Sequence, residues 1–251
     1  MCQPVGGLLP TMSLPSKVLI MIPAYNEEQT VGGIVKSVKD LHPDFRVVVI
    51  DDGSDDGTVK NAAEAGAEVV SLPFHCGGSI AIQTGYRMAA RHEVDYTVKI
   101  DADGQHKPDE ISNMLEPLMN GEADITVGSR YSVHNSHNGD SSVKNGGRLF
   151  SSTLVSMLRK MEVTDVTSGM RAWNRKAIRT LMNQYKERKV TEDSVFWVAE
   201  TFLASKLGLR MQEVAIDVLP RRYGKSKSFS NGKMLMYPLR LVATLLEELV
   251  S

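Results

Sequence analysis

The sequence predicts an α/β fold in which helices flank a doubly wound, mainly parallel sheet. Along residues 17–130, short apolar runs alternate with longer amphipathic segments. Each apolar run is continuous, which is typical of strands that helices cover on both faces. No internal repeat or inter-domain linker interrupts residues 17–251. We therefore expect one domain over residues 17–251, preceded by a flexible N-terminal arm over residues 1–16.

Local signals set the expected boundaries of the elements in the first half. Pro23 is expected to end the first strand, because proline has no N–H for a sheet hydrogen bond. Asn26 is a plausible N-cap of the first helix, Gly66 ends the second and Pro108 begins the fourth. The expected strands are 17–22, 46–50, 67–72, 96–100 and 123–130, and the expected helices are 26–41, 58–65, 79–93 and 108–121.

The second half of the chain is less regular. Its expected elements are a polar loop at 131–145, a helix at 141–161, a turn and a helix within 163–182, a helix at 191–208, a strand at 210–222 and a loop at 223–232. The last stretch, 233–251, contains Pro238, Arg240 and Glu247 and is too polar for a membrane span. We expect an amphipathic helix that packs on its own domain, with burial in a membrane interface as the alternative.

Composition excludes several classes of protein. The 251 residues are 42% hydrophobic and carry a net charge of −1, so a general nucleic-acid binder is not expected. Cys2 and Cys76 lie far apart, which fits a reduced cytosolic setting without a disulfide or zinc site. No signal peptide is recognisable. We expect a cytoplasmic protein, with attachment to the cytoplasmic face of a membrane as a further possibility.

Acidic residues follow the predicted strands at the points where they end. They are Glu27 after the first strand, Asp51 and Asp52 after the second, and Asp101 and Asp103 after the fourth. In a parallel sheet these positions share one edge, where ligands bind. Like charges in one cleft require a cation or hydrogen-bond donors. Hard oxygen ligands of this kind suit Mg²⁺ or Mn²⁺ together with a diphosphate.

Some of these acids have a simpler interpretation. Asp55, Asp56 and Thr58 suit the capping and first turn of the next helix. Asp101 and Asp103 are two acids more than capping requires, and Gly104 permits a turn that aims both at one site. A calcium loop starting at Asp52 fails, because its twelfth position is Ala63 rather than Glu. Neither GxGxxG nor GxxxxGK[ST] occurs, which excludes a dinucleotide fingerprint and a P-loop.

Three motifs carry a family resemblance. "IPAYNEE", "VVVIDDGSDDGT" and "KIDADGQHKPDEI", in this order and spacing, resemble the family 2 glycosyltransferases, whose GT-A fold is Rossmann-like. "VGSRY", "GGRLFSS", "TDVTSGMRAW" and "RRYGKSK" are similar to the dolichyl-phosphate mannose synthase and polyprenyl-phosphate glycosyltransferase branch. The resemblance implies a nucleotide-sugar half over 17–130 and an acceptor half with the C-terminal helix over 131–251.

The resemblance also implies roles for residues of the donor site. The nucleotide would be cradled by Pro23, Ala24, Tyr25 and Glu27, and Asp52 would accept a hydrogen bond from its base. Asp101, Asp103 and Gln105 belong to the motif that holds the metal and the diphosphate, with Asp103 and Gln105 as metal ligands. Catalytic roles are expected for Asp101, Asp103, Arg130 and Asp193.

Cations of the second half suit an acceptor that carries a phosphate, because arginine binds phosphate through two parallel hydrogen bonds. The expected acceptor-phosphate residues are Arg130, Arg148, Ser152, Arg171, Arg222 and Lys227. A phosphate monoester is already ionised at pH 7 and needs no general base, whereas a sugar hydroxyl does. Glu192 and Asp193 stand where other branches of the family place that base. A capping box that starts at Thr191 explains the same acids, and both interpretations stay open.

Together these features predict a hexosyltransferase of glycan or cell-wall biosynthesis. It would be inverting and metal-dependent, and would move a sugar from a UDP- or GDP-sugar to a polyprenyl or dolichyl phosphate. A saccharide hydroxyl acceptor with Asp193 as base is one alternative. A non-catalytic nucleotide-sugar-binding subunit is another. A peripheral membrane contact or a membrane partner subunit is expected if the acceptor is a lipid.

Overall fold

The computed structural model describes residues 17–131, 142–159, 163–187, 193–220 and 231–250. A seven-stranded sheet runs through these residues in the order β3-β2-β1-β4-β6-β5-β7. Its strands are β1 (Val18–Ala24), β2 (Arg46–Asp51), β3 (Glu68–Ser71), β4 (Tyr96–Lys99), β5 (Ile125–Ser129), β6 (Arg171–Asn174) and β7 (Met211–Ala215). The helices are α1 (Val31–Leu41), α2 (Thr58–Glu64), α3 (Gly78–Arg91), α4 (Ile111–Met119), α5 (Ser142–Arg159), α6 (Arg175–Glu187), α7 (Phe196–Lys206) and α8 (Asn231–Val250), and a 3₁₀ turn, η1 (Pro108–Glu110), precedes α4.

The sheet is mixed but mainly parallel, which confirms the predicted fold class. β3, β2, β1 and β4 run parallel to one another, and β7 runs parallel to β5. β6 is antiparallel to both of its neighbours, β4 and β5. The sequence analysis placed only a turn and a helix in this region, and that prediction was wrong for β6. The four residues of β6 are too few to show the alternation of a strand, and the strands with which they pair, β4 and β5, lie far away in the chain.

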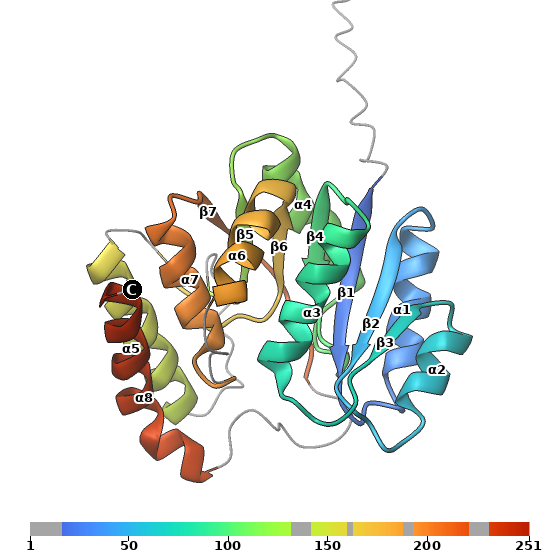
Figure 1. Cartoon of the computed structure of the whole chain (residues 1–251), viewed down its shortest axis with the longest axis horizontal. Helices are drawn as coiled ribbons and strands as arrows, with labels where there is room; N and C mark the ends of the chain where they lie inside the picture. The colour runs from blue at the N-terminus through green and yellow to red at the C-terminus, as the bar shows by residue number, and fades with distance from the viewer. Residues whose placement is uncertain (1–16, 132–141, 160–162, 188–192, 221–230, 251) are drawn as a thin grey trace, which may run out of the picture.

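Helices cover both faces of the sheet, as Figure 1 shows. α1, α2 and α4 pack on one face, where Val18, Ile20 and Ile22 of β1 point. α3, α6 and α7 pack on the other face, where Leu19 and Met21 point. Every side chain of this strand segment is therefore buried, which explains why its apolar run does not alternate with polar residues.

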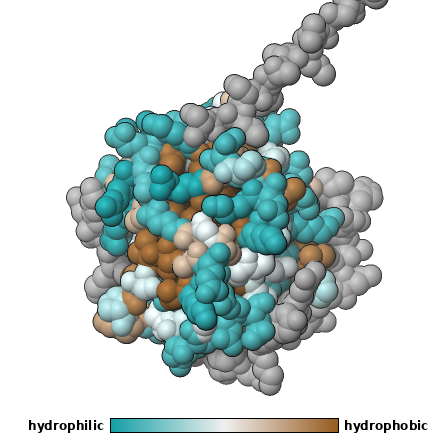
Figure 2. Space-filling view, turned by 90° about the vertical axis from the view of Figure 1, so that its right-hand side faces the viewer, coloured by the Kyte–Doolittle hydropathy of each residue, from teal (hydrophilic) through white to brown (hydrophobic). Residues whose placement is uncertain are grey.

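A third cluster of apolar side chains lies between α5, α7 and α8. α5 and α8 lie side by side at the end of the molecule opposite β3 (Figure 1). Figure 2 shows the side on which β3 forms the edge of the sheet, where hydrophilic residues surround smaller apolar areas. Of the described helices, none is long and apolar enough to cross a membrane.

The first strand continues through Pro23 to Ala24, so the prediction that Pro23 ends it was wrong. The carbonyl of Ala24 accepts a hydrogen bond from Asp52 N–H on the β2 side, and the carbonyl of Met21 accepts one from Ile100 N–H on the β4 side. The backbone N–H and C=O groups of residues 21 and 23 therefore point toward β4. Because the pairing with β4 ends at Met21, an N–H at Pro23 would have no partner in β4, and proline is tolerated there.

The loop after β1 also differs from the prediction. Asn26 is not the cap of α1, which begins at Val31, and it adopts φ 52°. Instead, Asn26 N–H donates to Ser54 Oγ, and its Oδ1 accepts from Asp55 N–H. Asp56 accepts hydrogen bonds from the N–H groups of Glu28 and Thr58. The N-cap of α2 is Gly57 and its first turn holds no acid, so the capping role expected of Asp55 and Asp56 was wrong. Asp56 instead ties together the loops after β1 and β2.

Asp124 fixes the start of β5. Its buried carboxylate accepts hydrogen bonds from the backbone and side chain of Arg210, from Asn174 Nδ2 at 3.0 Å and from Lys176 Nζ at 3.2 Å. Burial alone would raise the pKa of Asp124, but the hydrogen bonds from Arg210, Asn174 and Lys176 lower it below its ordinary value of 3.8. The ionised carboxylate therefore stabilises the fold.

We expect Asp124→Asn to lower the free energy of unfolding by about 2 kcal/mol at pH 7, because charge-assisted hydrogen bonds are lost. Because the folded-state pKa is depressed, this stabilisation is present above pH 3.8 and is lost as the pH falls through the folded value. The difference between variant and wild type should therefore shrink below about pH 4 in urea denaturation. Asp44→Asn, at an exposed position, is the matched control. A constant difference down to pH 2 would contradict the expectation.

Candidate active site

The carboxyl ends of β1, β2 and β4 open into a cavity of about 860 Å³. Its lining includes residues from the ends of several strands and from the segment before α7. The predicted site residues among them are Pro23, Ala24, Tyr25, Asp52, Asp101, Gln105, Arg130 and Asp193. Parallel pairing of β1 with both neighbours places these strand ends at one edge. The structure therefore brings together acids and cations from distant parts of the sequence.

Asp52 holds the loop that leads into α3. Its oxygens accept hydrogen bonds from Cys76 N–H at 2.7 Å and Gly77 N–H at 2.9 Å, and His75 Nδ1 lies 2.8 Å away. The His75 ring stacks on Tyr25, with ring centroids 3.9 Å apart. The carboxylate is buried, so its main visible role is to shape the wall of the cavity. The predicted contact to a nucleotide base stays a prediction.

Gly53 lets this wall form. Its φ is +72°, in the left-handed region that favours glycine. A Cβ at this position would lie 2.6 Å from the backbone carbon of Phe74. The loop after β2 can therefore reach the loop before α3 only because residue 53 has no side chain.

Asp193 caps a helix, but not the helix that follows it. Its carboxylate accepts hydrogen bonds from Gly78 N–H at 2.9 Å and Ser79 N–H at 2.7 Å, at the start of α3. The next helix, α7, begins only at Phe196, with Val195 as its N-cap. Asp193 therefore does not cap α7, as the capping-box interpretation required, and its charge stabilises the N-terminus of α3. Glu192 lies outside the described residues.

Asp101 is bordered by a lysine and a histidine. Its carboxylate forms an ion pair with Lys99 Nζ, and its backbone N–H donates to His106 Nδ1 at 3.0 Å. Because Nδ1 accepts this bond, the ring proton of neutral His106 is on Nε2. Burial lowers the pKa of His106 from 6.5 to about 4, against the opposing effect of Asp101. His106 is therefore neutral at pH 7 and forms no ion pair with Asp101.

The predicted metal ligands lie in the turn after β4. Gly104 adopts φ +75°, as the expected turn requires. Asp103 Oδ1 accepts from Gln105 N–H at 3.0 Å, and Gln105 Nε2 donates to the carbonyl of Leu219 at 3.3 Å. Within the described ranges, no three His, Cys, Asp or Glu side chains are grouped to hold a metal ion. Hard oxygen donors without a complete protein shell fit a Mg²⁺-like cation that shares its ligands with a substrate phosphate.

Two predicted donor-site residues, Glu27 and Asp103, are absent from the lining of the cavity. Glu27 Oε2 accepts a hydrogen bond from Thr30 Oγ1 at 3.3 Å, and its backbone N–H donates to Thr58 Oγ1 at 2.8 Å. In this geometry Glu27 belongs to the turn that leads into α1. Its predicted contact with a nucleotide stays a prediction.

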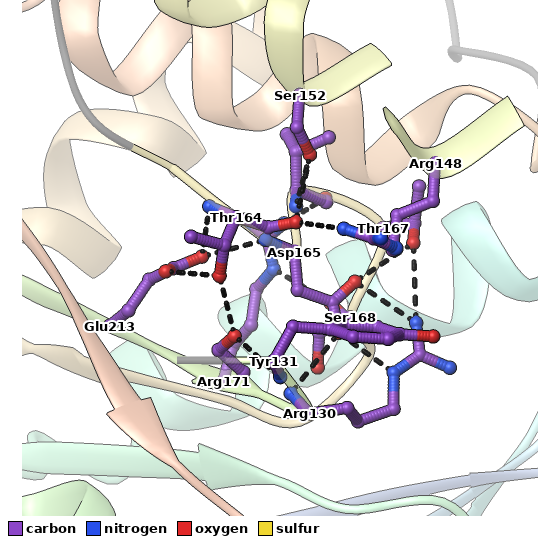
Figure 3. A network of polar contacts seen from close by, with 12 residues as sticks. Arg130, Tyr131, Arg148, Ser152, Thr164, Asp165, Thr167, Ser168, Arg171 and Glu213 are labelled. Carbon is purple, nitrogen blue, oxygen red and sulfur yellow. Dashed lines mark hydrogen bonds and ion pairs between the residues drawn. The ribbon is translucent and has the colours of Figure 1, made fainter. Parts of the chain in front are cut away.

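Three of the predicted acceptor-phosphate residues meet around residues 164–167, as Figure 3 shows. Arg130 forms two hydrogen bonds with Asp165, from Nε at 2.7 Å and from Nη2 at 2.9 Å. The Arg148 guanidinium lies 3.7 Å from the centroid of the Tyr131 ring, and Nη1 donates to the carbonyl of Thr164. Ser152 Oγ donates to the same carbonyl at 3.2 Å. The structure thus gathers Arg130, Arg148 and Ser152 at one place.

Arg171 contacts the same segment from inside the protein, and its predicted role as an acceptor ligand stays a prediction. Its side chain is fully buried in β6, 3.7 Å from Glu200. Its guanidinium donates to the carbonyls of Val166 and Ser168. Burial lowers the pKa of Arg171, and Glu200 opposes this effect. Arg171 is absent from the lining of the cavity. Arg222 and Lys227 lie outside the described residues.

Sequence reasoning missed Lys99, His106 and Trp197, all of which line the cavity. Lys99 had a visible signal, because "YTVKI" places a lysine inside an otherwise apolar strand. His106 lies within the motif "DADGQH" and was passed over as part of a turn. Trp197 had no such signal, because an aromatic residue at the start of an apolar helix is typical of a core position.

Comparison with known proteins identifies the family. The model of the family described as Glycosyl transferase family 2 matches residues 19–182. The chain belongs to glycosyl transferase family 2. Its match spans the acidic strand ends, the cavity wall at Asp52 and the loop at 164–167.

Several relatives of this family 2 glycosyltransferase have names that state a lipid-phosphate acceptor. The UDP-N-acetylglucosamine–dolichyl-phosphate N-acetylglucosaminyltransferase of Methanococcus voltae is 28% identical, over 91% of this chain and 94% of its own length. The polyprenol monophosphomannose synthase of Mycolicibacterium smegmatis is 30% identical, over 90% of this chain and 87% of its own. The undecaprenyl-phosphate mannosyltransferase of Micrococcus luteus is 29% identical, over 84% of this chain and 87% of its own length.

Solved structures support the fold. Glucosyl-3-phosphoglycerate synthase from Mycobacterium tuberculosis, crystallised with Mn²⁺, UDP-glucose and phosphoglyceric acid, has a TM-score of 0.69 and 22% identity, covering 92% of this chain and 79% of its own. The same enzyme with Mg²⁺ and UDP has a TM-score of 0.67 over the same shares of the chains. At this identity the likeness concerns the fold, which is that of GT-A glycosyltransferases.

The interactions of Asp52 predict a measurable effect on stability. We expect Asp52→Asn to lower the free energy of unfolding by about 2 kcal/mol, because an amide cannot accept all the bonds that the carboxylate accepts. Asp55→Asn is the matched control, since Asp55 is exposed on the same loop and should change stability by less than about 0.5 kcal/mol. Urea denaturation of both variants measures the difference. Equal effects would contradict the structural role of Asp52.

Proposed function

We propose that this family 2 glycosyltransferase moves a sugar, with inversion, from a UDP- or GDP-sugar to a polyprenyl or dolichyl phosphate, using Mg²⁺ or Mn²⁺. The observation that carries the proposal is the shared cavity, whose lining includes Asp101, Gln105, Arg130 and Thr167. Asp101 and Gln105 offer oxygen ligands, and Arg130 offers a cation. This arrangement suits a donor diphosphate next to an anionic acceptor.

On the donor side, Asp103 and Gln105 are the residues that would hold the metal. A bound divalent cation supplies electrostatic stabilisation of the departing nucleoside diphosphate. The Tyr25 and His75 rings, together with Pro23 and Ala24, form the part of the wall on which the nucleotide would lie. Asp52 acts through His75 and the following backbone, because it fixes the shape of this wall.

On the acceptor side, Arg130 is a predicted acceptor-phosphate residue that lines the cavity. In its ion pair with Asp165 the arginine is the exposed partner, since 23% of the Arg130 side chain is exposed and none of Asp165. A phosphate bound there would contact arginine rather than the carboxylate. Arg148 and Ser152, both on α5, donate to the carbonyl of Thr164 and so extend the polar region from Asp165 to this helix.

The geometry of Asp193 favours a phosphate acceptor over a hydroxyl acceptor. A sugar hydroxyl needs a general base, and Asp193 was the candidate. Its two oxygens accept hydrogen bonds from Gly78 N–H and Ser79 N–H, so the carboxylate is already engaged at the start of α3. A phosphate monoester requires no such base. The named relatives support the same choice, because their names contain dolichyl-phosphate, undecaprenyl-phosphate and polyprenol monophosphomannose.

The outer faces of α5 and α8 support contact with a membrane or with a membrane partner subunit. The inner face of α8 packs through Tyr237, Leu241 and Leu245, as the sequence analysis expected. Other large apolar side chains of the two helices are exposed: Leu149, Phe150, Met157, Leu158, Met236, Leu239, Val242, Leu246 and Leu249. An amphipathic helix with such a face suits the interface of a bilayer. A lipid-linked acceptor would then enter along α5, which also carries Arg148.

Removal of the metal ligand tests the proposal. We expect Asp103→Ala to reduce sugar transfer from UDP-glucose or GDP-mannose to undecaprenyl phosphate by about 100-fold, because the leaving diphosphate loses its cation. EDTA should have a similar effect on the wild type. Asp109→Ala, on the neighbouring 3₁₀ turn, is the control for nonspecific effects. Full activity of Asp103→Ala, or full activity in EDTA, would contradict the proposal, and donor binding without any transfer would indicate a non-catalytic subunit.

A second variant distinguishes the two acceptor classes. We expect Asp193→Asn to keep transfer to a polyprenyl phosphate within about 10-fold of the wild type, because the phosphate needs no base and loss of a helix cap alone costs about 1 kcal/mol. Radiolabel transfer measures activity, and calorimetry of nucleotide binding checks that the donor site is intact. Loss of transfer by more than about 100-fold with unchanged donor binding would assign the base role to Asp193.

A further inference from the structure

Lys99 is a buried lysine in the lining of the cavity. Its side chain is 4% exposed and forms an ion pair with Asp101. Because Val98 points to the face covered by α1 and α4, Lys99 leaves β4 on the opposite face. It lies directly opposite Arg171 in the antiparallel register of β4 and β6. Like charges in opposite positions of a sheet are unfavourable. Each cation has a carboxylate of its own, Asp101 or Glu200, so the structure maintains a charge where an apolar side chain would fit the strand better.

Gly169 keeps the head of Lys99 uncovered. A Cβ at position 169 would lie 2.8 Å from Lys99 Nζ, 3.3 Å from Asp101 Oδ2 and 3.7 Å from Trp197 Nε1. The missing side chain therefore leaves three polar groups side by side at one point of the wall. All four residues line the cavity. We call Lys99, Asp101, Gly169 and Trp197 the Lys99 niche.

The niche combines two hydrogen-bond donors with one acceptor. Lys99 and Trp197 offer N–H groups, and Asp101 offers a carboxylate oxygen. A phosphate oxygen only accepts hydrogen bonds, and without a cation in between it would be repelled by Asp101. A hydroxyl group donates and accepts at once, so it can donate to Asp101 while it accepts from Lys99. The Trp197 ring adds an apolar surface, with Lys99 Nζ 5.2 Å from its centroid.

We propose that the Lys99 niche binds hydroxyl groups of the transferred sugar and that Lys99 is a specificity-determining residue of the donor site. This inference rests on the proposed function, because it assumes a nucleotide-sugar donor. Asp101 belongs both to the Lys99 niche and to the motif that would hold the metal and the diphosphate. The niche therefore lies next to the proposed diphosphate position, where the sugar is attached. Lys99 then recognises the sugar and leaves recognition of the diphosphate to other groups.

The test compares ligands with and without the sugar. The probes are UDP with UDP-glucose and GDP with GDP-mannose, in the presence of Mn²⁺, titrated calorimetrically into the full chain. We expect Lys99→Met to weaken binding of the matching nucleotide sugar by about 10-fold, the size of a lost charge-assisted hydrogen bond. Binding of the free nucleoside diphosphate should not change. Lys176→Met is the matched control, since Lys176 pairs with Asp124 outside the cavity and should leave both affinities unchanged.

Gly169→Ala tests the niche without removal of its charges. The added methyl group covers Lys99 and Asp101. It should therefore weaken binding of the nucleotide sugar and leave binding of the free nucleoside diphosphate unchanged. This variant decides the question if Lys99→Met does not fold, which thermal unfolding will show.

Equal weakening of nucleotide and nucleotide sugar in Lys99→Met would assign Lys99 to the diphosphate and overturn the inference. Unchanged binding of both ligands in a folded Lys99→Met, or in Gly169→Ala, would overturn it as well. If the wild type binds none of the four probes, the proposed function fails together with the inference. If the wild type binds them and only the sugar-specific effect is missing, the proposed function stands.

Discussion

The parallel pairing of β1 with β2 and β4 is the constraint on which the rest of this structure depends. It brings the ends of the three strands to one edge of the sheet, and the acids predicted for the donor site follow these strands. Without this pairing, Asp52 and Asp101 would be unrelated turn residues. The pairing is possible because α1 to α4 cover both faces of the strands and keep water from their backbone.

Buried charge around the cavity is arranged in pairs. Asp101 faces Lys99, Asp165 faces Arg130 and Glu200 faces Arg171. Other carboxylates are neutralised by backbone N–H groups, as Asp52 is at Cys76 and Gly77. A charge without such a partner would be costly at this depth. The acids around the cavity therefore divide into those that shape its walls and those proposed to face a ligand.

This division could not be read from the sequence. Asp52 and Asp101 occupy equivalent places after their strands, yet both oxygens of Asp52 are turned toward the protein. Asp193 was expected to act near its own helix or on a substrate, and it caps α3 instead. The bonds from Gly78 and Ser79 to Asp193 join residues more than 110 positions apart in the chain. No local sequence pattern predicts such a contact, because it depends on how the segment before α7 packs against the start of α3 in the folded chain.

The sequence by itself determined the alternation of strands and helices in the first half, the edge at which the site lies and the family to which the chain belongs. These features follow from local periodicity, turn residues and motif order, which act over a few neighbouring positions. Only the tertiary structure decided that β6 inserts antiparallel between β4 and β5, that Arg171 is enclosed with Glu200 and that Lys99 reaches the floor of the cavity. Each of these outcomes depends on burial and charge pairing between distant segments, which exist only once the chain has folded.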